Sequence, residues 1–174
     1  VATLGTAACA RSIPLQLAAL VLSELEGRGH SCLLLDDLAA DPAALLGWAE
    51  EDWKALARAA KPLPRGAKGW ITQLAACEQV WRVGDLDYDQ PLVLDDSRLY
   101  LRRYWRDETL VATCVRARAQ QRRAVDIDQA HTWLEALFGT QRAGESPDWQ
   151  RIACAVALRG SFAVIPGGPG TGPP

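Results

Sequence analysis

Apolar residues recur at helical spacing along much of this chain, in stretches separated by short runs rich in glycine and proline. The first stretch predicts a core helix that begins near Ile13, with Ser12 as its N-cap and Pro14 in a first turn where its missing N–H is harmless. Gly27 or Gly29 closes this helix. We expect one buried stripe along it, formed by Leu17, Ala18, Leu20, Val21 and Leu25.

Asp41 and Pro42 predict the start of a second helix, because aspartate is a good N-cap and proline suits the position after it. Two prolines and a glycine within Lys61–Gly66 must end this helix. Between the two helices, Cys32–Leu35 fits either a short buried strand or an apolar turn, and the pattern does not decide. The second helix has a broad apolar face made of Leu45, Leu46, Trp48, Ala49, Trp53 and Leu56.

The middle of the chain predicts short strands. A short helical turn over residues 70–76 precedes a possible strand at Val80–Val83. Two apolar runs, Pro91–Leu94 and Arg98–Leu101, are joined by Asp95–Ser97, three residues of types that favour turns. This arrangement is the clearest β-hairpin signal in the sequence.

Two more helices are expected after the hairpin. The first starts at Asp107 and ends in the basic tract Arg116–Arg123. The second runs from about Asp128 to Phe138 and stops at Gly139. One face of the first helix carries Leu110, Val111, Cys114, Val115 and Arg118.

Loop-forming residues at Gly144–Pro147 predict a domain boundary. We expect a mainly helical N-terminal domain of the α+β class over residues 1–144, with the β-hairpin inside it. A second domain then starts over residues 145–174, where Ser146 and Asp148 offer N-cap oxygens to a further helix.

A strand and a loop typical of nucleotide sites follow that helix. The apolar run Phe162–Ile165 predicts a buried strand. Gly167 and Gly172, with four residues between them, have the spacing of the first half of a phosphate-binding P-loop, in which backbone N–H groups turn inward around a phosphate. Pro173 and Pro174 stand where that pattern requires Lys and then Ser or Thr. The loop therefore lacks the ammonium and hydroxyl groups that hold phosphate and Mg²⁺.

These segments carry a resemblance to a known family. Gln150–Leu158 followed by Val164–Gly172 resembles the start of the helicase core in the RecD family, the alpha subunit of exodeoxyribonuclease V. Arg98–Glu108 resembles the segment ahead of that family's motor, and Gly29–Leu35 its N-terminal part.

The resemblance implies a DNA helicase subunit that acts with RecB and RecC in double-strand break repair and recombination. It also implies a RecA-like α/β P-loop motor after the N-terminal domain, with ATP and Mg²⁺ as cofactors of the complete protein. In such helicases a glutamine ahead of the P-loop reads the adenine edge, and a carboxamide suits this task because it donates and accepts at once. The nucleotide-binding residues implied here are Gln150, Gly167, Gly168, Pro169, Gly170, Thr171 and Gly172.

Charge and cysteine content narrow the function further. The net charge of −2 does not favour a free DNA-binding domain, which is usually basic, so DNA contact is expected elsewhere in the complete protein or its assembly. Five scattered cysteines without a C-x-x-C pair indicate reduced thiols in a cytoplasmic protein. No apolar run reaches the length of a bilayer span, so we expect no membrane association.

Three local patterns imitate other sites. The oxygen ligands of a calcium-binding EF-hand are imitated by Asp85, Asp87, Asp89 and Asp96. Gln90 stands where that loop requires glycine, so an acidic surface loop is favoured. His30 and Cys32 have only His131 as a further imidazole, which favours a structural role over zinc. The basic tract Arg116–Arg123 faces either phosphates or solvent, and helical spacing favours solvent. We therefore predict no catalytic residue and no metal ligand.

Two hypotheses follow for the chain as a whole. It begins without Met and ends inside the glycine-rich motif, so we expect a piece of a longer helicase subunit that is inactive alone and serves subunit contact. Alternatively, it is a stand-alone protein-interaction module without a nucleotide site. A natural continuation with Lys-Thr after Gly172 would favour the first. We expect this domain to bind the other exodeoxyribonuclease V subunits, RecC first, through an amphipathic cluster of Arg102, Arg103, Tyr104, Trp105 and Arg106.

Overall fold

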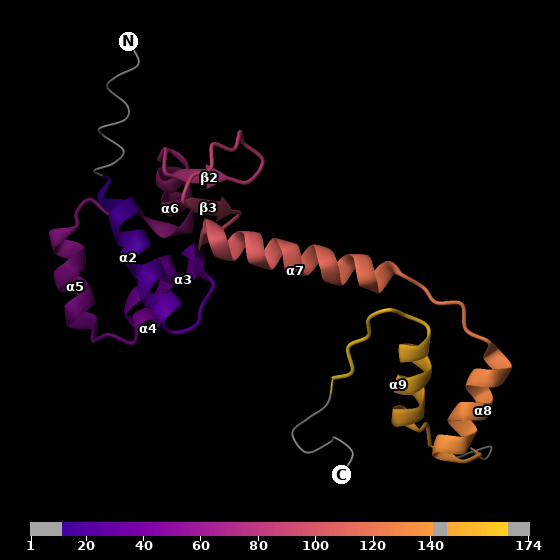
Figure 1. The fold of residues 1–174 in the computed structure, drawn as a ribbon. Coiled ribbons are helices and arrows are strands. Elements are labelled where there is room, and N and C mark those ends of the chain that lie inside the picture. Colours follow the sequence, from indigo (N-terminus) through magenta and orange to yellow (C-terminus); the bar gives the residue numbers. More distant parts are fainter. Residues whose placement is uncertain (1–11, 141–145, 167–174) are drawn as a thin grey trace. The chain divides into compact units, whose positions relative to one another are not determined.

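The computed structural model describes residues 12–140 and 146–166. The chain divides into two compact units, Val1–Glu108 and Thr109–Pro174, called here the N-terminal and the C-terminal unit (Figure 1). The predicted boundary at Gly144–Pro147 concerns the start of a motor domain, and it stays a prediction.

The N-terminal unit combines helices with a small sheet, which confirms the mainly helical α+β class. Its helices are α2 (Ile13–Gly27), α3 (Leu35–Ala40), α4 (Pro42–Leu46), α5 (Glu50–Ala59), α6 (Gly66–Ala75) and the first residues of α7 (Arg102–Gln120). Its strands are β1 (Cys32–Leu34), β2 (Val80–Arg82), β3 (Leu92–Asp95) and β4 (Arg98–Leu101). The C-terminal unit contains the rest of α7, together with α8 (Ile127–Phe138) and α9 (Trp149–Leu158).

Helix α2 forms where its cap predicts it. Ser12 Oγ accepts a hydrogen bond from the N–H of Leu15 at 3.4 Å, and Pro14 lies in the first turn. The predicted stripe is buried except at Leu20, which is 53% exposed because it lies about 100° around the helix from Val21, outside the buried face.

The prediction of one continuous helix from Pro42 up to the break at Lys61 is wrong, because two helices, α4 and α5, occupy this segment. Gly47 adopts a left-handed conformation, φ 62° and ψ 31°, and ends α4 after little more than one turn. The predicted cap is confirmed, since Asp41 Oδ1 accepts a hydrogen bond from the N–H of Ala44 at 3.0 Å. Helix α3 was not predicted.

The sheet has the strand order β1–β4–β3–β2. Strands β3 and β4 pair antiparallel and confirm the predicted hairpin, whose turn places Asp96 at φ 51°. Strand β1 pairs antiparallel with β4, which decides in favour of a strand at Cys32–Leu34. Strand β2 lies parallel to β3 at the other edge, within the segment predicted as a strand.

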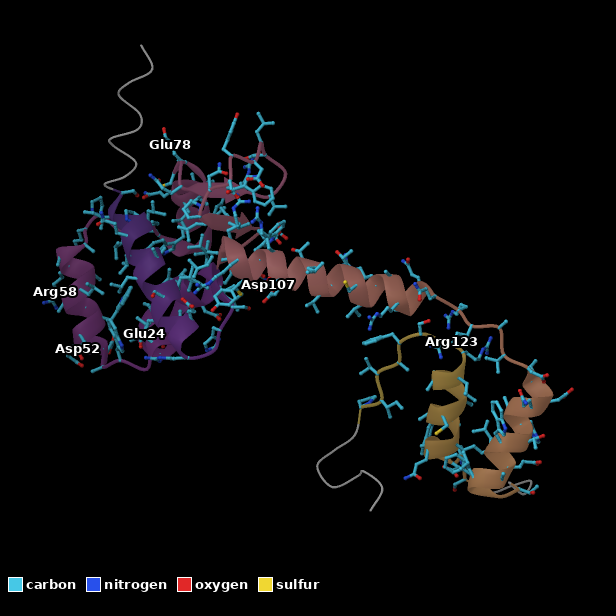
Figure 2. The ribbon with its side chains drawn as sticks, viewed as in Figure 1. Glu24, Asp52, Arg58, Glu78, Asp107 and Arg123 are labelled. Carbon is cyan, nitrogen blue, oxygen red and sulfur yellow. The ribbon has the colours of Figure 1, made fainter. Side chains whose placement is uncertain are left out.

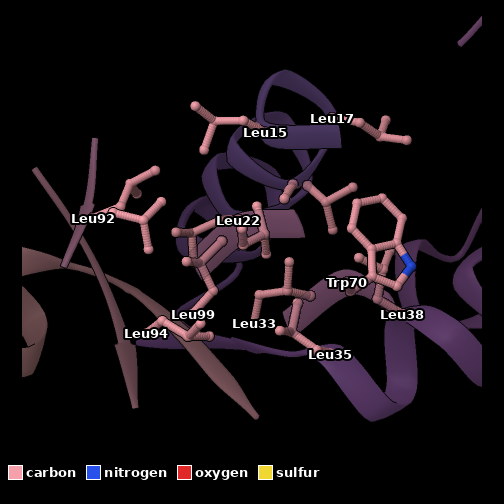
Figure 3. Packing of buried hydrophobic residues seen from close by; sticks show 14 of the residues in the cluster. Leu15, Leu17, Leu22, Leu33, Leu35, Leu38, Trp70, Leu92, Leu94 and Leu99 are labelled. Carbon is pink, nitrogen blue, oxygen red and sulfur yellow. The ribbon is translucent and has the colours of Figure 1, made fainter. Parts of the chain in front are cut away.

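The two faces of the sheet bury different clusters. On one face, side chains such as Leu33, Leu94 and Leu99 pack with α2, α3 and α6 in the main hydrophobic core (Figure 3). On the other face, Trp81, Val93 and Tyr100 form a smaller cluster against which Cys32, Tyr104 and Trp105 pack. Side chains alternate between the two faces because a strand has a two-residue period. Through Tyr104 and Trp105, the smaller cluster packs the first turn of α7 against the sheet.

Helix α7 begins at Arg102, so the predicted start at Asp107 is wrong. The N–H of Arg102 donates to the carbonyl of Pro91 at 2.9 Å, which fixes the turn from β4 into the helix. Tyr104 and Trp105 then pack beside the smaller cluster. Tertiary contacts therefore start this helix before the position at which the local cap signal predicts it.

The C-terminal unit confirms two predicted helices and lacks a predicted strand. Asp126 caps α8 and Asp148 caps α9, each through a carboxylate oxygen that accepts two backbone N–H bonds. Phe162–Ile165 forms no strand, and Val164 is 73% exposed. A strand needs a neighbour to satisfy its backbone groups, and the described residues provide none at this position.

The described helices include none with both the length and the apolar character needed to cross a bilayer.

Candidate functional site

Of the residues predicted to bind nucleotide, the structure describes only Gln150. Gln150 lies in the first turn of α9 with an exposed side chain, and its N–H donates to Asp148 Oδ1 at 3.0 Å. The other predicted nucleotide residues lie outside the described residues: Gly167, Gly168, Pro169, Gly170, Thr171 and Gly172. Their place around a phosphate stays a prediction.

Helix α9 presents apolar side chains to solvent next to Gln150. Trp149 is 74% exposed and Val156 is 59% exposed. Ile152 and Val156 also line a shallow hollow closed on its other side by Val164 and Ile165. These side chains have the apolar character of a buried face, although the described residues do not bury them.

A network centred on Arg102 joins the start of α7 to the loop between β2 and β3. Arg102 is only 8% exposed, and its guanidinium holds the Asp87 carboxylate with two bonds of 2.9 Å and 2.7 Å. Its Nε donates to the carbonyl of Gln90. A bidentate pair of this kind fixes direction as well as distance, so the loop is held in one place.

The same network lowers the pKa of Asp87. The main cause is the hydrogen bond from Arg102, and the N–H of Asp89 adds a second bond at 2.8 Å. Both stabilise the ionised carboxylate relative to the protonated acid. Arg106 extends the network on the exposed side with an ion pair to Asp89 at 3.1 Å.

Two tryptophans lie against this network. Trp81 lies under the Arg102 guanidinium, 5.1 Å from its ring centroid, and makes an edge-on contact with Trp105 at 5.0 Å. The ring nitrogens are also bonded, from Trp81 to the carbonyl of Asp85 at 3.1 Å and from Trp105 to Asp95 at 3.2 Å. Both rings are therefore held by specific contacts within the N-terminal unit.

Three further bonds attach α7 to the end of α2 and to the residues just after it. Glu26 accepts hydrogen bonds from the Tyr104 hydroxyl at 2.8 Å and from the Arg103 guanidinium. One turn later, Ser31 donates to the carboxylate of Glu108. The first two turns of α7, up to Glu108 at the end of the N-terminal unit, are thus hydrogen-bonded to the rest of that unit.

The amphipathic cluster predicted as a docking surface is largely used inside the molecule. Arg102 is buried, Tyr104 and Trp105 are half-buried, and each of the five residues has a partner within the N-terminal unit. The sequence could not reveal this, because the carboxylates that pair with these residues lie far from them along the chain.

The acidic pattern near the hairpin is a surface loop paired with arginines. Asp85 pairs with Arg82 at 3.0 Å, while Asp87 and Asp89 pair with arginines of α7. Across residues 12–140 and 146–166, no group of three or more His, Cys, Asp or Glu side chains could hold a metal ion. The calcium alternative therefore has no support in the described residues.

Cys32 and Tyr100 adjoin on the same face of the sheet as the smaller cluster. Burial raises the pKa of the Cys32 thiol. The pKa of Tyr100 is raised to about 12, mainly by burial and further by the neighbouring Cys32 and Glu108. Both side chains are therefore neutral near pH 7, which suits a packing role and not a nucleophilic one.

A groove beside the edge strand β2 carries the most exposed large apolar side chains among the described residues of the N-terminal unit. It has a volume of about 790 Å³ and is lined by residues of α6, β2 and the following loop, among them Trp81 and Gln90. Leu86 and Tyr88 also line it, and each is 76% exposed. We call this region the β2 groove. Sequence reasoning missed it, although two large apolar residues alternating with aspartates in a loop are a signal for it.

Comparison with known proteins gives consistent matches. The family model for the RecBCD enzyme subunit RecD, N-terminal domain, matches residues 2–100. The chain is 34% identical over 84 residues to the RecBCD enzyme subunit RecD of Haemophilus influenzae, across 47% of this chain and 13% of that protein. It is 38% identical over 93 residues to the RecBCD enzyme subunit RecD of Mycobacterium tuberculosis, across 52% of this chain and 15% of that protein. The chain therefore spans only about one seventh of these relatives' length.

Proposed function

This chain belongs to the family of the RecD N-terminal domain, and on that basis we propose that it is the N-terminal part of an ATP-dependent helicase subunit of exodeoxyribonuclease V. The complete protein unwinds DNA in the cytoplasm during double-strand break repair and recombination, together with RecB and RecC. Within it, the N-terminal unit serves subunit contact.

One observation carries this proposal. The family match over residues 2–100 falls inside the compact unit Val1–Glu108, which has its own hydrophobic core. The family signal thus coincides with a folded unit, and not with the glycine-rich end.

The surface that suits subunit contact best is the β2 groove. Leu86 and Tyr88 expose apolar area next to an edge strand, and their loop is held in place by the bidentate pair between Arg102 and Asp87. An ordered apolar surface binds with a smaller loss of conformational entropy than a mobile one. Tyrosine is also enriched at the centres of protein interfaces. We propose that RecC contacts this groove.

The test is co-purification of the chain with RecC and RecB from the same organism, comparing wild type with Leu86→Asp and Tyr88→Ala. We expect each substitution to weaken binding about thirtyfold, because central interface residues are worth at least about 2 kcal/mol. Leu20→Ala is the matched control, since Leu20 is exposed on α2 in the same unit. Equal recovery of RecC with all four chains would refute the β2 groove as the contact. A wild-type chain that binds neither subunit, while the complete protein binds both, would refute the docking role.

For the complete protein we propose a nucleotide site that uses Gln150 for adenine and the Gly167–Gly172 backbone for phosphates, with Mg²⁺. Gln150 lies in the first turn of α9, and the Asp148 cap holds the backbone from which its carboxamide extends. Pro173 and Pro174 lack the ammonium and hydroxyl groups that complete such a site.

We therefore expect no ATPase activity from the 174-residue chain and a dissociation constant for Mg-ATP no tighter than about 1 mM, since each lost charged hydrogen bond costs about 1.5–3 kcal/mol. Calorimetry with Mg-ATP measures this directly. Micromolar binding, or turnover by the purified chain, would contradict this account of the site.

A further inference from the structure

The β2 groove follows the open edge of the sheet. Strand β2 is the last strand in the order β1–β4–β3–β2, and the groove is lined by all of its residues, by the end of α6 and by the loop after β2. Helix α6 packs on the main-core face of the sheet. The loop lies on the other face, where Asp85 accepts the Trp81 bond and Asp87 is held by Arg102. A hollow lined from both faces runs along the edge between them.

Strand β2 bonds to β3 through every second residue. The N–H of Val83 donates to the carbonyl of Leu94 at 3.0 Å, and the N–H of Leu92 donates to the carbonyl of Gln79 at 3.2 Å. In a parallel pair, alternate residues of a strand bond to the same neighbour. The N–H and C=O groups of the even-numbered residues of β2 therefore point away from β3, into the groove.

Two of these outward groups have no backbone partner among the described residues. The N–H of Val80 donates to the carbonyl of Cys77, and the carbonyl of Arg82 accepts from the N–H of Asp85, each at 3.0 Å. The carbonyl of Val80 and the N–H of Arg82 are left over. An acceptor and a donor two residues apart on one edge are the groups that a single residue of an added parallel strand can satisfy.

The side chains of the groove indicate what such a strand carries. Leu86 and Tyr88 expose apolar area, which suits an apolar side chain. Among the charged lining residues, Arg82 and Asp85 pair with each other at 3.0 Å. Glu78, labelled in Figure 2, is exposed and has no ion-pair partner within the described residues. Its charge is complementary to a lysine or arginine.

We propose that the partner adds a strand to β2: an extended segment of RecC, with an apolar and a basic side chain, lies in the β2 groove and bonds to Val80 and Arg82. This inference rests on the proposed contact between RecC and the β2 groove, and it adds the backbone arrangement of that contact. In strand addition, main-chain hydrogen bonds provide affinity, while the side-chain pockets beside the edge provide specificity.

A proline substitution tests the backbone bond. Arg82→Pro removes the outward N–H and leaves the ladder to β3 intact, and proline is tolerated in edge strands. Arg82→Ala is the matched control, because it also loses the ion pair with Asp85 but keeps the N–H. In calorimetric titrations with purified RecC, we expect Arg82→Pro to bind about tenfold more weakly than Arg82→Ala, since a carbonyl of RecC loses its donor. Circular dichroism checks that both variants are folded.

Amide hydrogen exchange tests the same bond without a substitution. In the wild-type chain, the N–H of Arg82 should exchange at least about tenfold more slowly when RecC is bound, because it becomes a strand donor. The N–H of Val83 is the internal reference, since it is already bonded to Leu94 in the free chain.

The outcomes separate this inference from the proposed function. If Leu86→Asp weakens RecC binding while Arg82→Pro and Arg82→Ala bind equally and the Arg82 amide stays unprotected, strand addition is overturned and the groove contact stands. RecC binding that none of these substitutions changes overturns both. A dimer of the chain alone that Arg82→Pro abolishes would assign the edge to a second copy and overturn the assignment to RecC.

Discussion

The two units of this chain contain similar helices but differ in what surrounds them. In the N-terminal unit, side chains such as Leu22, Leu33 and Leu99 are almost fully buried between helices and a sheet. No described residue after Arg102 is buried, although α8 and α9 are amphipathic and well capped. Local signals are thus sufficient to place a helix, whereas a core needs segments from several parts of the chain.

The largest expected effect tests this contrast in packing. Leu99→Ala should lower the free energy of unfolding by about 2–5 kcal/mol, because it opens a cavity in a fully buried position. Leu137→Ala, at a residue of α8 that is 74% exposed, should change it by no more than about 0.5 kcal/mol. Urea denaturation of both variants measures the difference. Similar losses for both would mean that α8 has a core of its own.

A second prediction concerns the network that holds the loop before β3. Arg102→Ala should cost about 2–3 kcal/mol, since it removes the side-chain donor of the Gln90 carbonyl and the two guanidinium bonds to the Asp87 carboxylate. The expected loss is below that of a fully buried pair because Asp87 is partly exposed. Arg106→Ala removes an exposed pair and should cost less than about 1 kcal/mol. Chemical denaturation distinguishes the two, and equal losses would argue against a special role for Arg102.

Helix caps should behave differently in the two units. Asp126→Ala removes the acceptor of two backbone bonds at the start of α8 and should cost that helix about 1 kcal/mol. Because no described residue of that unit is buried, we expect a visible loss of helical circular dichroism at room temperature. Ser12→Ala should instead leave helicity unchanged and lower only the unfolding midpoint, since α2 is held by the core. A midpoint shift without loss of helicity in Asp126→Ala would contradict this distinction.

The smallest effect is expected from the titration of Asp87. The pKa of this carboxyl is lower in the folded protein than its usual value of 3.8, mainly because Arg102 donates to the ionised form. Its contribution to stability is therefore present above about pH 4 and is lost as the pH falls through the lower folded pKa. Asp87→Asn should flatten this acid limb in denaturation curves recorded between neutral and acid pH. An unchanged slope would show that other carboxylates determine the acid limb.

The sequence predicted best those elements that depend on local chemistry. Ser12, Asp41 and Asp148 cap helices as expected, and the hairpin forms around Asp95–Ser97. These signals involve residues within one turn of each other, so a pattern along the chain is enough to find them.

Predictions failed where a distant segment decides the outcome. Phe162–Ile165 has the composition of a strand but no neighbouring strand among the described residues. The early start of α7 depends on contacts of Arg102 with Asp87 and the Pro91 carbonyl, which no local cap signal indicates. Of the candidate nucleotide site only Gln150 is described, and the remaining residues stay predictions.

The strand order of the sheet has a consequence for how the N-terminal unit folds. Strands β3 and β4 follow each other directly, so their hairpin can form within microseconds. Strand β1 pairs with β4 only after the intervening helices and β2 have been brought together, so of the three strand pairings this one has the largest loop-closure entropy. Substitutions at Val93 should therefore slow folding, whereas substitutions at Leu33 should mainly speed unfolding. Strand β1, the first strand in the sequence and an edge of the sheet, would then be the last strand to pair.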